Sequence, residues 1–155
     1  MRPALFLDRD GVINVDSGYV GKQEDFEFFP GIFDICRIAK QLGYLIFVVT
    51  NQSGIGRGYY TEQDFLKLND WMCGVFKEHG VEIDKVYYCS SLDSPDRKPE
   101  PGMILRAAEE YDIDLSRSIL VGDKDTDIQA GIAAGVGVNL LLRRKPITEE
   151  LYGSL

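Results

Sequence analysis

Two carboxylates separated by a single residue stand at the end of an apolar run near the start of the chain. Asp8 and Asp10 follow the run Ala4–Leu7, and Gly11 comes directly after them. Carboxylates placed side by side repel each other unless a cation or a shared proton relieves them. The pair therefore predicts a site for a hard cation such as Mg²⁺, a nucleophile with its acid/base partner, or both. The alternative is a strand end whose two acids are simply solvated.

Three further polar clusters each come after another apolar run. They are Thr50 with Asn51 after residues 44–49, Lys98 after residues 85–89, and Asp123 with Asp127 after residues 118–121. Several acids supply the hard oxygen ligands that Mg²⁺ prefers, and a lysine with a hydroxyl suits a phosphoryl group. A carboxylate nucleophile divides ester hydrolysis into two easier steps through an aspartyl-phosphate. The set therefore predicts phosphate-ester hydrolysis, with the second acid of the pair protonating the leaving alkoxide and then activating water.

Apolar periodicity places these clusters on alternating strands and helices. Strands are expected at 4–7, 44–49, 85–89, 118–121 and 136–142, helices at 32–42, 61–79, 101–111 and 128–134, and a long polar loop at 9–29. The alternation predicts an α/β fold, with a parallel sheet of about five strands and helices on both faces. Ligands bind such sheets outside the carboxyl ends of the strands. Because every cluster lies at such an end, we expect one shared site.

Composition limits the class of protein. The 155 residues suit one domain spanning 1–155, and 45% hydrophobic with 27% charged residues is ordinary for a globular chain. The net charge of −8 argues against a nucleic-acid partner, because a protein needs a basic surface to bind nucleic acid.

The short N-terminal apolar run does not resemble a signal peptide, and no run approaches the roughly 20 residues of a membrane span. Three widely spaced cysteines show no disulfide framework, so we expect a reduced, cytoplasmic monomer acting on a small phosphorylated ligand.

Four motifs in this order resemble those of the haloacid dehalogenase (HAD) superfamily. They are residues 7–11 (LDRDG), Thr50, residues 98–99 (KP) and residues 122–127 (GDKDTD). The resemblance implies a Rossmann-like HAD fold in which Asp8 is the nucleophile and Asp10 is the general acid/base. It also implies that Thr50 and Lys98 hold the phosphoryl oxygens. The implied magnesium ligands are the side chains of Asp8 and Asp123 and the backbone carbonyl of Asp10, with Asp127 in the outer shell.

Within the superfamily the chain resembles the D-glycero-D-manno-heptose 1,7-bisphosphate 7-phosphatases. The segments that carry this resemblance are 8–14 (DRDGVIN), 16–19 (DSGY), 50–58 (TNQSGIGRG), 97–99 (RKP) and 122–124 (GDK). It implies removal of the 7-phosphate in nucleotide-heptose biosynthesis, which serves lipopolysaccharide or capsule. From its positive charge, and not from the resemblance, Arg57 is also expected to contact the distal phosphate of the substrate. The expected substrate contacts are Asp16, Ser17, Gly18, Tyr19, Thr50, Asn51, Gln52, Ser53, Arg57, Arg97, Lys98 and Lys124.

The loop before Arg97 departs from the family pattern. The heptose phosphatases and the related histidinol-phosphatases usually carry a structural zinc there, bound by Cys-x-His and Cys-x-Cys. Here Cys89 takes the first ligand position, Ser91 replaces the histidine, and Ser94 and Asp96 stand where the later cysteines would be. One thiolate cannot make a tetrahedral zinc site, so no zinc is expected. The gaps between the motifs also leave no room for a cap domain, so specificity is left to loops.

Three other functions stay open from the sequence. Histidinol phosphate or another small sugar phosphate is an alternative substrate, because the histidinol-phosphatases share the aspartate pair and the TNQ start. Polynucleotide 3′-phosphatases have similar motifs, but the net charge of −8 and the lack of a basic stripe count against that class. A receiver-type phospho-acceptor domain also combines Asp, Thr, Lys and Mg²⁺. Receivers, however, have no acid that corresponds to Asp10, two residues beyond the acceptor.

Overall fold

A single sheet of five parallel strands forms the centre of the molecule. The structure is a computed structural model that describes residues 1–143. The strands are β1 (Ala4–Leu7), β2 (Leu45–Asn51), β3 (Lys85–Cys89), β4 (Ile119–Gly122) and β5 (Val138–Leu141). Their order in space is β3-β2-β1-β4-β5, with every pair parallel. The strand order therefore reverses between β1 and β4, and the predicted α/β fold with a five-stranded parallel sheet is confirmed.

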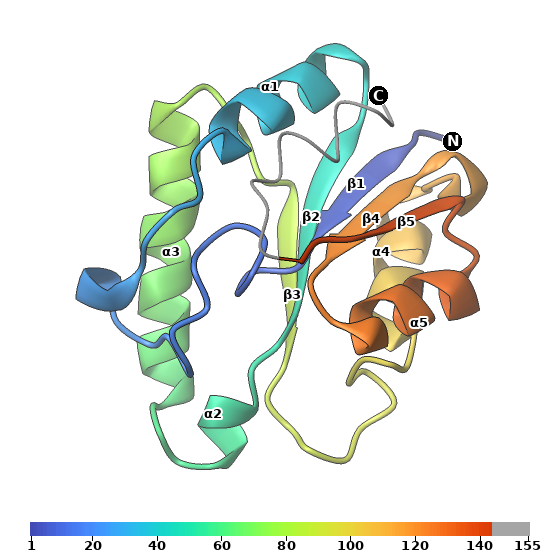
Figure 1. Cartoon of the computed structure of the whole chain (residues 1–155). Coiled ribbons are helices and arrows are strands. Elements are labelled where there is room, and N and C mark those ends of the chain that lie inside the picture. The colour runs from blue at the N-terminus through green and yellow to red at the C-terminus, as the bar shows by residue number, and fades with distance from the viewer. Residues whose placement is uncertain (144–155) are drawn as a thin grey trace.

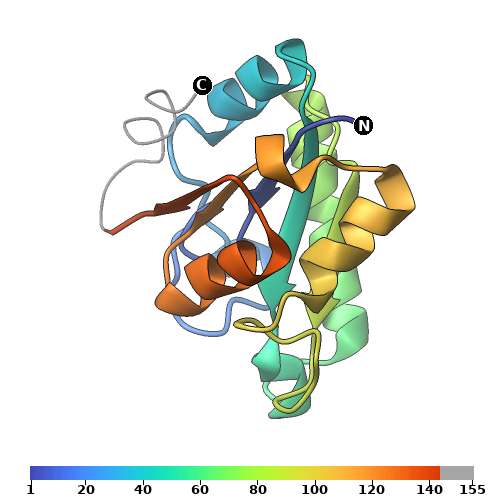
Figure 2. The same cartoon turned by 90° about the vertical axis from the view of Figure 1, so that its right-hand side faces the viewer.

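Helices cover both faces of this sheet. Helices α1 (Ile32–Gln41) and α3 (Glu62–Glu78) pack on one face, and α4 (Gly102–Tyr111) and α5 (Asp125–Ala134) pack on the other (Figures 1 and 2). Successive side chains of a strand point to opposite faces, so Leu5 and Leu7 of β1 join the first core layer. Ala4 and Phe6 join the second. All four residues of β1 are fully buried. This packing fixes the position of the strand that leads directly to Asp8 and Asp10.

Several boundaries differ from the expectation. Between the strand expected at 44–49 and the helix expected at 61–79, where the sequence predicts a glycine-rich loop, the chain forms a short helix, α2 (Ser53–Gly56). Single 3₁₀ turns form at η1 (Gln23–Asp25) and η2 (Leu115–Arg117). Strand β2 is longer than predicted, because Thr50 and Asn51 still pair with Tyr88 and Cys89 of β3. Strand β5 is shorter than the expected 136–142. After the last predicted strand, the sequence predicts a short polar tail at 143–155, which lies outside the described residues apart from Arg143.

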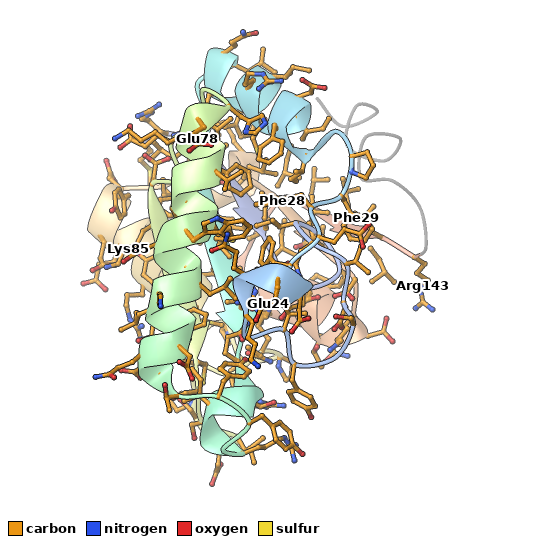
Figure 3. All side chains as sticks on the ribbon, turned by 90° about the vertical axis from the view of Figure 1, so that its left-hand side faces the viewer. Glu24, Phe28, Phe29, Glu78, Lys85 and Arg143 are labelled. Atoms are coloured by element: carbon orange, nitrogen blue, oxygen red, sulfur yellow. The ribbon has the colours of Figure 1, made fainter. Side chains whose placement is uncertain are left out.

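Aromatic packing holds the long segment between β1 and α1. The ring centroids of Phe26 and Phe28 lie 5.5 Å and 5.7 Å from that of Trp71 on α3, and the ring of Phe28 also packs against that of Phe76. Figure 3 labels Phe28, which lies beside α3. Between β1 and β3, the described chain holds η1, α1, β2, α2, α3 and their loops, and no inserted domain is found in this part of the described residues. Within residues 1–143, no helix has the length and apolar character needed to cross a membrane.

Candidate active site

The ends of β1 and β4 bring the acidic clusters together. Asp8 follows β1 and Asp123 follows β4, its neighbour at the reversal of strand order. One carboxylate oxygen from each of Asp8, Asp123 and Asp127 lies within 4.8 Å of the other two. Gly11 permits this approach, since its φ is +93° and a Cβ there would lie 2.0 Å from Asp123 Oδ2. The acids thus meet at the switch point, where α/β sheets bind their ligands.

Lys98 reaches this aspartate cluster from the loop after β3. Its Nζ donates hydrogen bonds to Asp8 Oδ1 (3.1 Å) and to the carbonyl of Val49 (2.8 Å), and it pairs with Asp127 Oδ1 (2.6 Å). Asn51 fixes the Lys98 backbone from both sides, donating from Nδ2 to its carbonyl (3.1 Å) and accepting its N–H at Oδ1 (3.0 Å). The lysine is therefore held as a buried counter-charge directly against the Asp8 carboxylate.

Burial and like charges set the electrostatics of the cluster. Burial raises the pKa of Asp8 well above its usual range; Lys98 opposes the shift, whereas Asp127, Asp123 and Asp10 add to it. Burial also raises the pKa of Asp123. For Lys98, burial acts to lower the pKa, but the carboxylates of Asp8 and Asp127 outweigh it and the pKa is raised. The cluster thus holds more negative charge than its one lysine balances.

The free oxygens of the cluster fit a magnesium ion. Asp123 Oδ1 is buried and has no hydrogen-bond partner within residues 1–143. Asp127, in contrast, uses both oxygens: Oδ1 pairs with Lys98, and Oδ2 accepts the backbone N–H groups of Asp123 and Lys124, each at 3.1 Å. Asp8 and Asp123 are therefore the side chains best able to hold Mg²⁺, and Asp127 is suited to orienting them. Carboxylate oxygens are the ligands that this ion prefers.

Asp10 lies in a separate hydrogen-bond network beside the cluster. Its Oδ1 accepts from Arg9 Nη2 and from Asn14 Nδ2, both at 3.0 Å, and its Oδ2 accepts from Gln52 Nε2 at 3.2 Å. The hydroxyl of Tyr60 donates in turn to Gln52 Oε1. Reasoning from the sequence missed Arg9, Asn14 and Tyr60. Arg9 and Asn14 lie in the segment 9–29, which was expected to be a polar loop, so no local signal marked them as buried.

The predicted substrate contacts gather around a cleft of about 460 Å³. Three predicted site residues do not line it: Ser17, Thr50 and Asp123. Thr50 is 1% exposed, and its Oγ1 accepts a hydrogen bond from Gln52 at 2.9 Å. The predicted residues that line the cleft are Asp8, Asp10, Asp16, Gly18, Tyr19, Asn51, Gln52, Ser53, Arg57, Arg97, Lys98, Lys124 and Asp127, and Gly54, Tyr60 and Thr126 line it without having been predicted.

Three cations besides Lys98 line the cleft, namely Arg57, Arg97 and Lys124. No carboxylate within residues 1–143 forms an ion pair with any of the three. Arg97 Nη1 is buried and has no hydrogen-bond partner among those residues. Donors that lack a protein partner are expected where a ligand supplies one. The cleft therefore combines an acidic end, whose carboxylates could hold a metal ion, with cations available to an anion.

Hydrogen bonds within the chain shape the loop between β3 and Lys98. Asp96 accepts a hydrogen bond from Arg106 on α4 at 2.6 Å, and the Asp96 N–H donates to Ser94 Oγ at 3.1 Å. Cys89 is 5% exposed and its Sγ lies 3.5 Å from the Ser91 carbonyl. Within residues 1–143, the aspartate cluster is the one group of three or more metal-ligating side chains. The absence of zinc stays a prediction.

Several proteins that are similar to this chain in sequence or in fold are named phosphatases. A HAD-hydrolase-like family model matches residues 96–146. The D-glycero-alpha-D-manno-heptose-1,7-bisphosphate 7-phosphatase of Burkholderia mallei is 57% identical over 149 residues, covering 90% of this chain and 79% of the relative. The corresponding beta-heptose enzyme of Vibrio cholerae is 47% identical, covering 96% and 86%. A crystal structure of D,D-heptose 1,7-bisphosphate phosphatase from B. bronchiseptica, complexed with magnesium and phosphate, superposes with a TM-score of 0.83 at 32% identity, covering 89% and 79%.

The fold, the site and these relatives define a phosphatase of the HAD-like hydrolases. Within that class, the chain belongs to the D-glycero-D-manno-heptose-1,7-bisphosphate 7-phosphatase family.

Proposed function

We propose that this protein hydrolyses the 7-phosphate of D-glycero-D-manno-heptose 1,7-bisphosphate through an aspartyl-phosphate on Asp8, with Mg²⁺ as cofactor. The observation that carries the proposal is the buried contact between Asp8 and Lys98, beside a carboxylate cluster that has oxygens free for a metal. The B. mallei and V. cholerae relatives support a heptose bisphosphate as the substrate, and the B. bronchiseptica structure, complexed with magnesium and phosphate, supports Mg²⁺ as the cofactor.

Asp8 is suited to attack because its environment fixes one carboxylate oxygen. Oδ1 accepts from the Arg9 N–H at 2.9 Å and from Lys98 Nζ at 3.1 Å, and no hydrogen bond to Oδ2 forms within the described residues. An oriented carboxylate next to a bound phosphate removes most of the entropic cost of the reaction. The bound Mg²⁺, held by Asp8, Asp123 and the Asp10 carbonyl, would neutralise charge on the phosphoryl oxygens and the nucleophile.

Asp10 is suited to proton transfer because three side chains orient its carboxylate at the edge of the cleft. In the first step, the bond from Asp8 to phosphorus forms, the ester bond breaks, and the leaving sugar oxygen takes a proton from Asp10. In the second step, Asp10 takes a proton from the water that attacks the phosphorus. Phosphate then leaves and Asp8 is regenerated.

The free cations of the cleft suit the second phosphate of a bisphosphate sugar. Arg97 has a buried, unpartnered Nη1 within the described chain, and Arg57 and Lys124 are exposed at the same cleft. A guanidinium binds a phosphate with two parallel hydrogen bonds. Histidinol phosphate carries one phosphate and would leave these cations unused, so we assign it as the weaker substrate.

Phosphorus NMR of the products tests this function directly. The α- and β-anomers of the heptose bisphosphate and histidinol phosphate are each incubated with enzyme and Mg²⁺. We expect rapid loss of the 7-phosphate from at least one heptose anomer, retention of the 1-phosphate, and much slower release from histidinol phosphate. Faster hydrolysis of histidinol phosphate, or loss of the 1-phosphate first, would contradict the proposal.

Two variants test the assigned roles. Asp8→Asn removes the nucleophile, so phosphate release should fall to a trace, and substantial remaining activity would exclude Asp8 from attack. Asp10→Asn removes the proton donor, so both formation and hydrolysis of the phosphoenzyme should slow by about 10²-fold or more, with Mg²⁺ binding largely kept. Rapid-quench kinetics measure the two steps separately, and normal rates for both would refute the acid/base role.

A further inference from the structure

Arg9, the residue between the two aspartates, is buried and directs its guanidinium at Asp10. It is 1% exposed and is the largest fully buried side chain among the described residues. Its Nε and Nη2 donate to Asp10 Oδ1 at 3.1 Å and 3.0 Å, and Nη2 also lies 3.2 Å from Oδ2. A buried guanidinium is costly unless it is paired, and here the partner is the proposed acid/base itself.

Two aromatic rings hold the Arg9 guanidinium in place. Its central carbon lies 5.8 Å from the ring centroid of Phe26 and 5.8 Å from that of Phe65. Phe26 belongs to the segment before α1, and Phe65 lies on α3. A guanidinium between two rings gains cation–π attraction and loses the freedom to rotate. The Arg9 side chain, which binds Asp10, is therefore fixed by two separate parts of the fold.

Arg9 also connects Asp10 to the loop that carries expected substrate contacts. Its Nη2 donates to the Val20 carbonyl at 2.6 Å, and Val20 directly follows the segment 16–19. Gly18 and Tyr19 of that segment line the cleft. One guanidinium thus fixes both the carboxylate and the adjoining wall of the cleft.

We propose that Arg9 is a positioning residue for the chemical step, which holds the Asp10 carboxylate where it can protonate the leaving sugar oxygen. The proposal rests on the proposed function and adds to it the reason why Asp10 is in place before substrate binds. A catalytic group misplaced by about 1 Å costs about 10²-fold in rate. Gln52 and Asn14 give Asp10 one bond each, and neither supplies the paired nitrogens that fix the plane of the carboxylate.

The leaving group distinguishes positioning of Asp10 from a purely structural role. In the first step the ester bond breaks and its electron pair stays on the leaving oxygen. A sugar alkoxide needs a proton at that moment, whereas p-nitrophenolate is stable without one. A variant that only misplaces Asp10 therefore loses rate with the sugar phosphate and keeps it with the aryl phosphate. A variant that damages the site generally loses rate with both.

The experiment measures phosphoenzyme formation by rapid quench for full-length enzyme with Mg²⁺ and two substrates, the heptose bisphosphate and p-nitrophenyl phosphate. Arg9→Met keeps an unbranched, largely apolar stem beside the two rings and removes the guanidinium, and Arg9→Lys keeps the charge without the paired nitrogens. For both variants we expect a loss of about 10²-fold with the heptose substrate and less than about threefold with p-nitrophenyl phosphate. In an Asp10→Asn background, Arg9→Lys should cause little further loss with the heptose substrate.

Arg117→Met is the matched control, because Arg117 Nε pairs with Asp114 at 2.8 Å on the exposed surface. It should change neither rate. Equal losses with both substrates for the Arg9 variants, additive losses in the double variant, or failure of both variants to fold would assign Arg9 to stability and overturn the proposal. A wild-type enzyme that forms no phosphoenzyme from either substrate would instead contradict the proposed function.

Discussion

The replacement of Gly11 by alanine tests whether Asp123, which follows β4, must pack against the loop after β1 to bind Mg²⁺ together with Asp8. Gly11 has a φ of +93°, and an added Cβ would lie 2.0 Å from Asp123 Oδ2 and 2.4 Å from Asp123 Cγ. Cβ contacts under 3.0 Å are essentially never found, so the Asp123 carboxylate must retreat by about 1 Å. We therefore expect Gly11→Ala to weaken Mg²⁺ binding by tenfold or more and to lower the catalytic rate by about 10²-fold.

Backbone strain accompanies this substitution and must be separated from the displacement of Asp123. An alanine in the left-handed region costs about 1–2 kcal/mol. Gly43, after α1, has a nearly equal φ of +91°, but no atom lies within 4 Å of its added Cβ. Gly43→Ala should therefore show similar destabilisation with normal Mg²⁺ dependence and normal activity, which makes it the matched control.

The assay titrates phosphate release against Mg²⁺ for the two variants and the wild type, with thermal unfolding measured alongside. The difference between Gly11→Ala and Gly43→Ala isolates the effect of moving Asp123. If Gly11→Ala showed wild-type Mg²⁺ dependence and activity, Asp123 would not be a ligand in the arrangement derived above.

Three further predictions concern Lys98, the cap of α3 and zinc. Lys98→Met removes the counter-charge of Asp8 and Asp127, so the chain should lose about 3–5 kcal/mol of stability in urea unfolding, and an unchanged midpoint would contradict that pairing. Thr61→Ala should lower the melting temperature by about 2–4 °C at neutral pH, because Thr61 caps α3 through a capping box with Asp64. The backbone N–H of Thr61, which alanine keeps, donates to Asp64 Oδ2 and lowers the pKa of Asp64, so this part of the stabilisation is present above the usual value of 3.8 and should be lost in both proteins as the pH falls through the lowered pKa. Elemental analysis of purified protein should find far less than one zinc per chain, and stoichiometric zinc would overturn the interpretation of the loop after Cys89.

Much of the fold and of the cluster followed from the sequence because the signals were local. The buried run before Asp8 has no polar residue, so its end is sharp, and the second acidic motif begins equally sharply after β4. Parallel strands place such ends at one edge, so the meeting of Asp8 and Asp123 needed no knowledge of side-chain packing.

The residues that reasoning from the sequence missed depend on long-range packing. Arginine is usually found at the surface, and the burial of Arg9 depends on its ion pair with Asp10 and on the rings of Phe26 and Phe65, which come from other parts of the chain. Thr50 was predicted to hold the phosphoryl oxygens, and that role stays a prediction; the sequence did not indicate that β2 continues through Thr50, where it pairs with Tyr88 of β3. Helix α2 was missed because a glycine-rich sequence has low helix propensity.

Identification of the phosphorylated residue tests the central claim most directly. Enzyme mixed with the heptose bisphosphate and Mg²⁺ is quenched in acid within the first turnover, digested, and mapped by mass spectrometry. We predict one acid-stable, base-labile phosphoryl group on the peptide that contains Asp8, absent when Mg²⁺ is removed. Rapid turnover without any phosphorylated peptide, or a phosphoryl group on a different residue, would contradict the account.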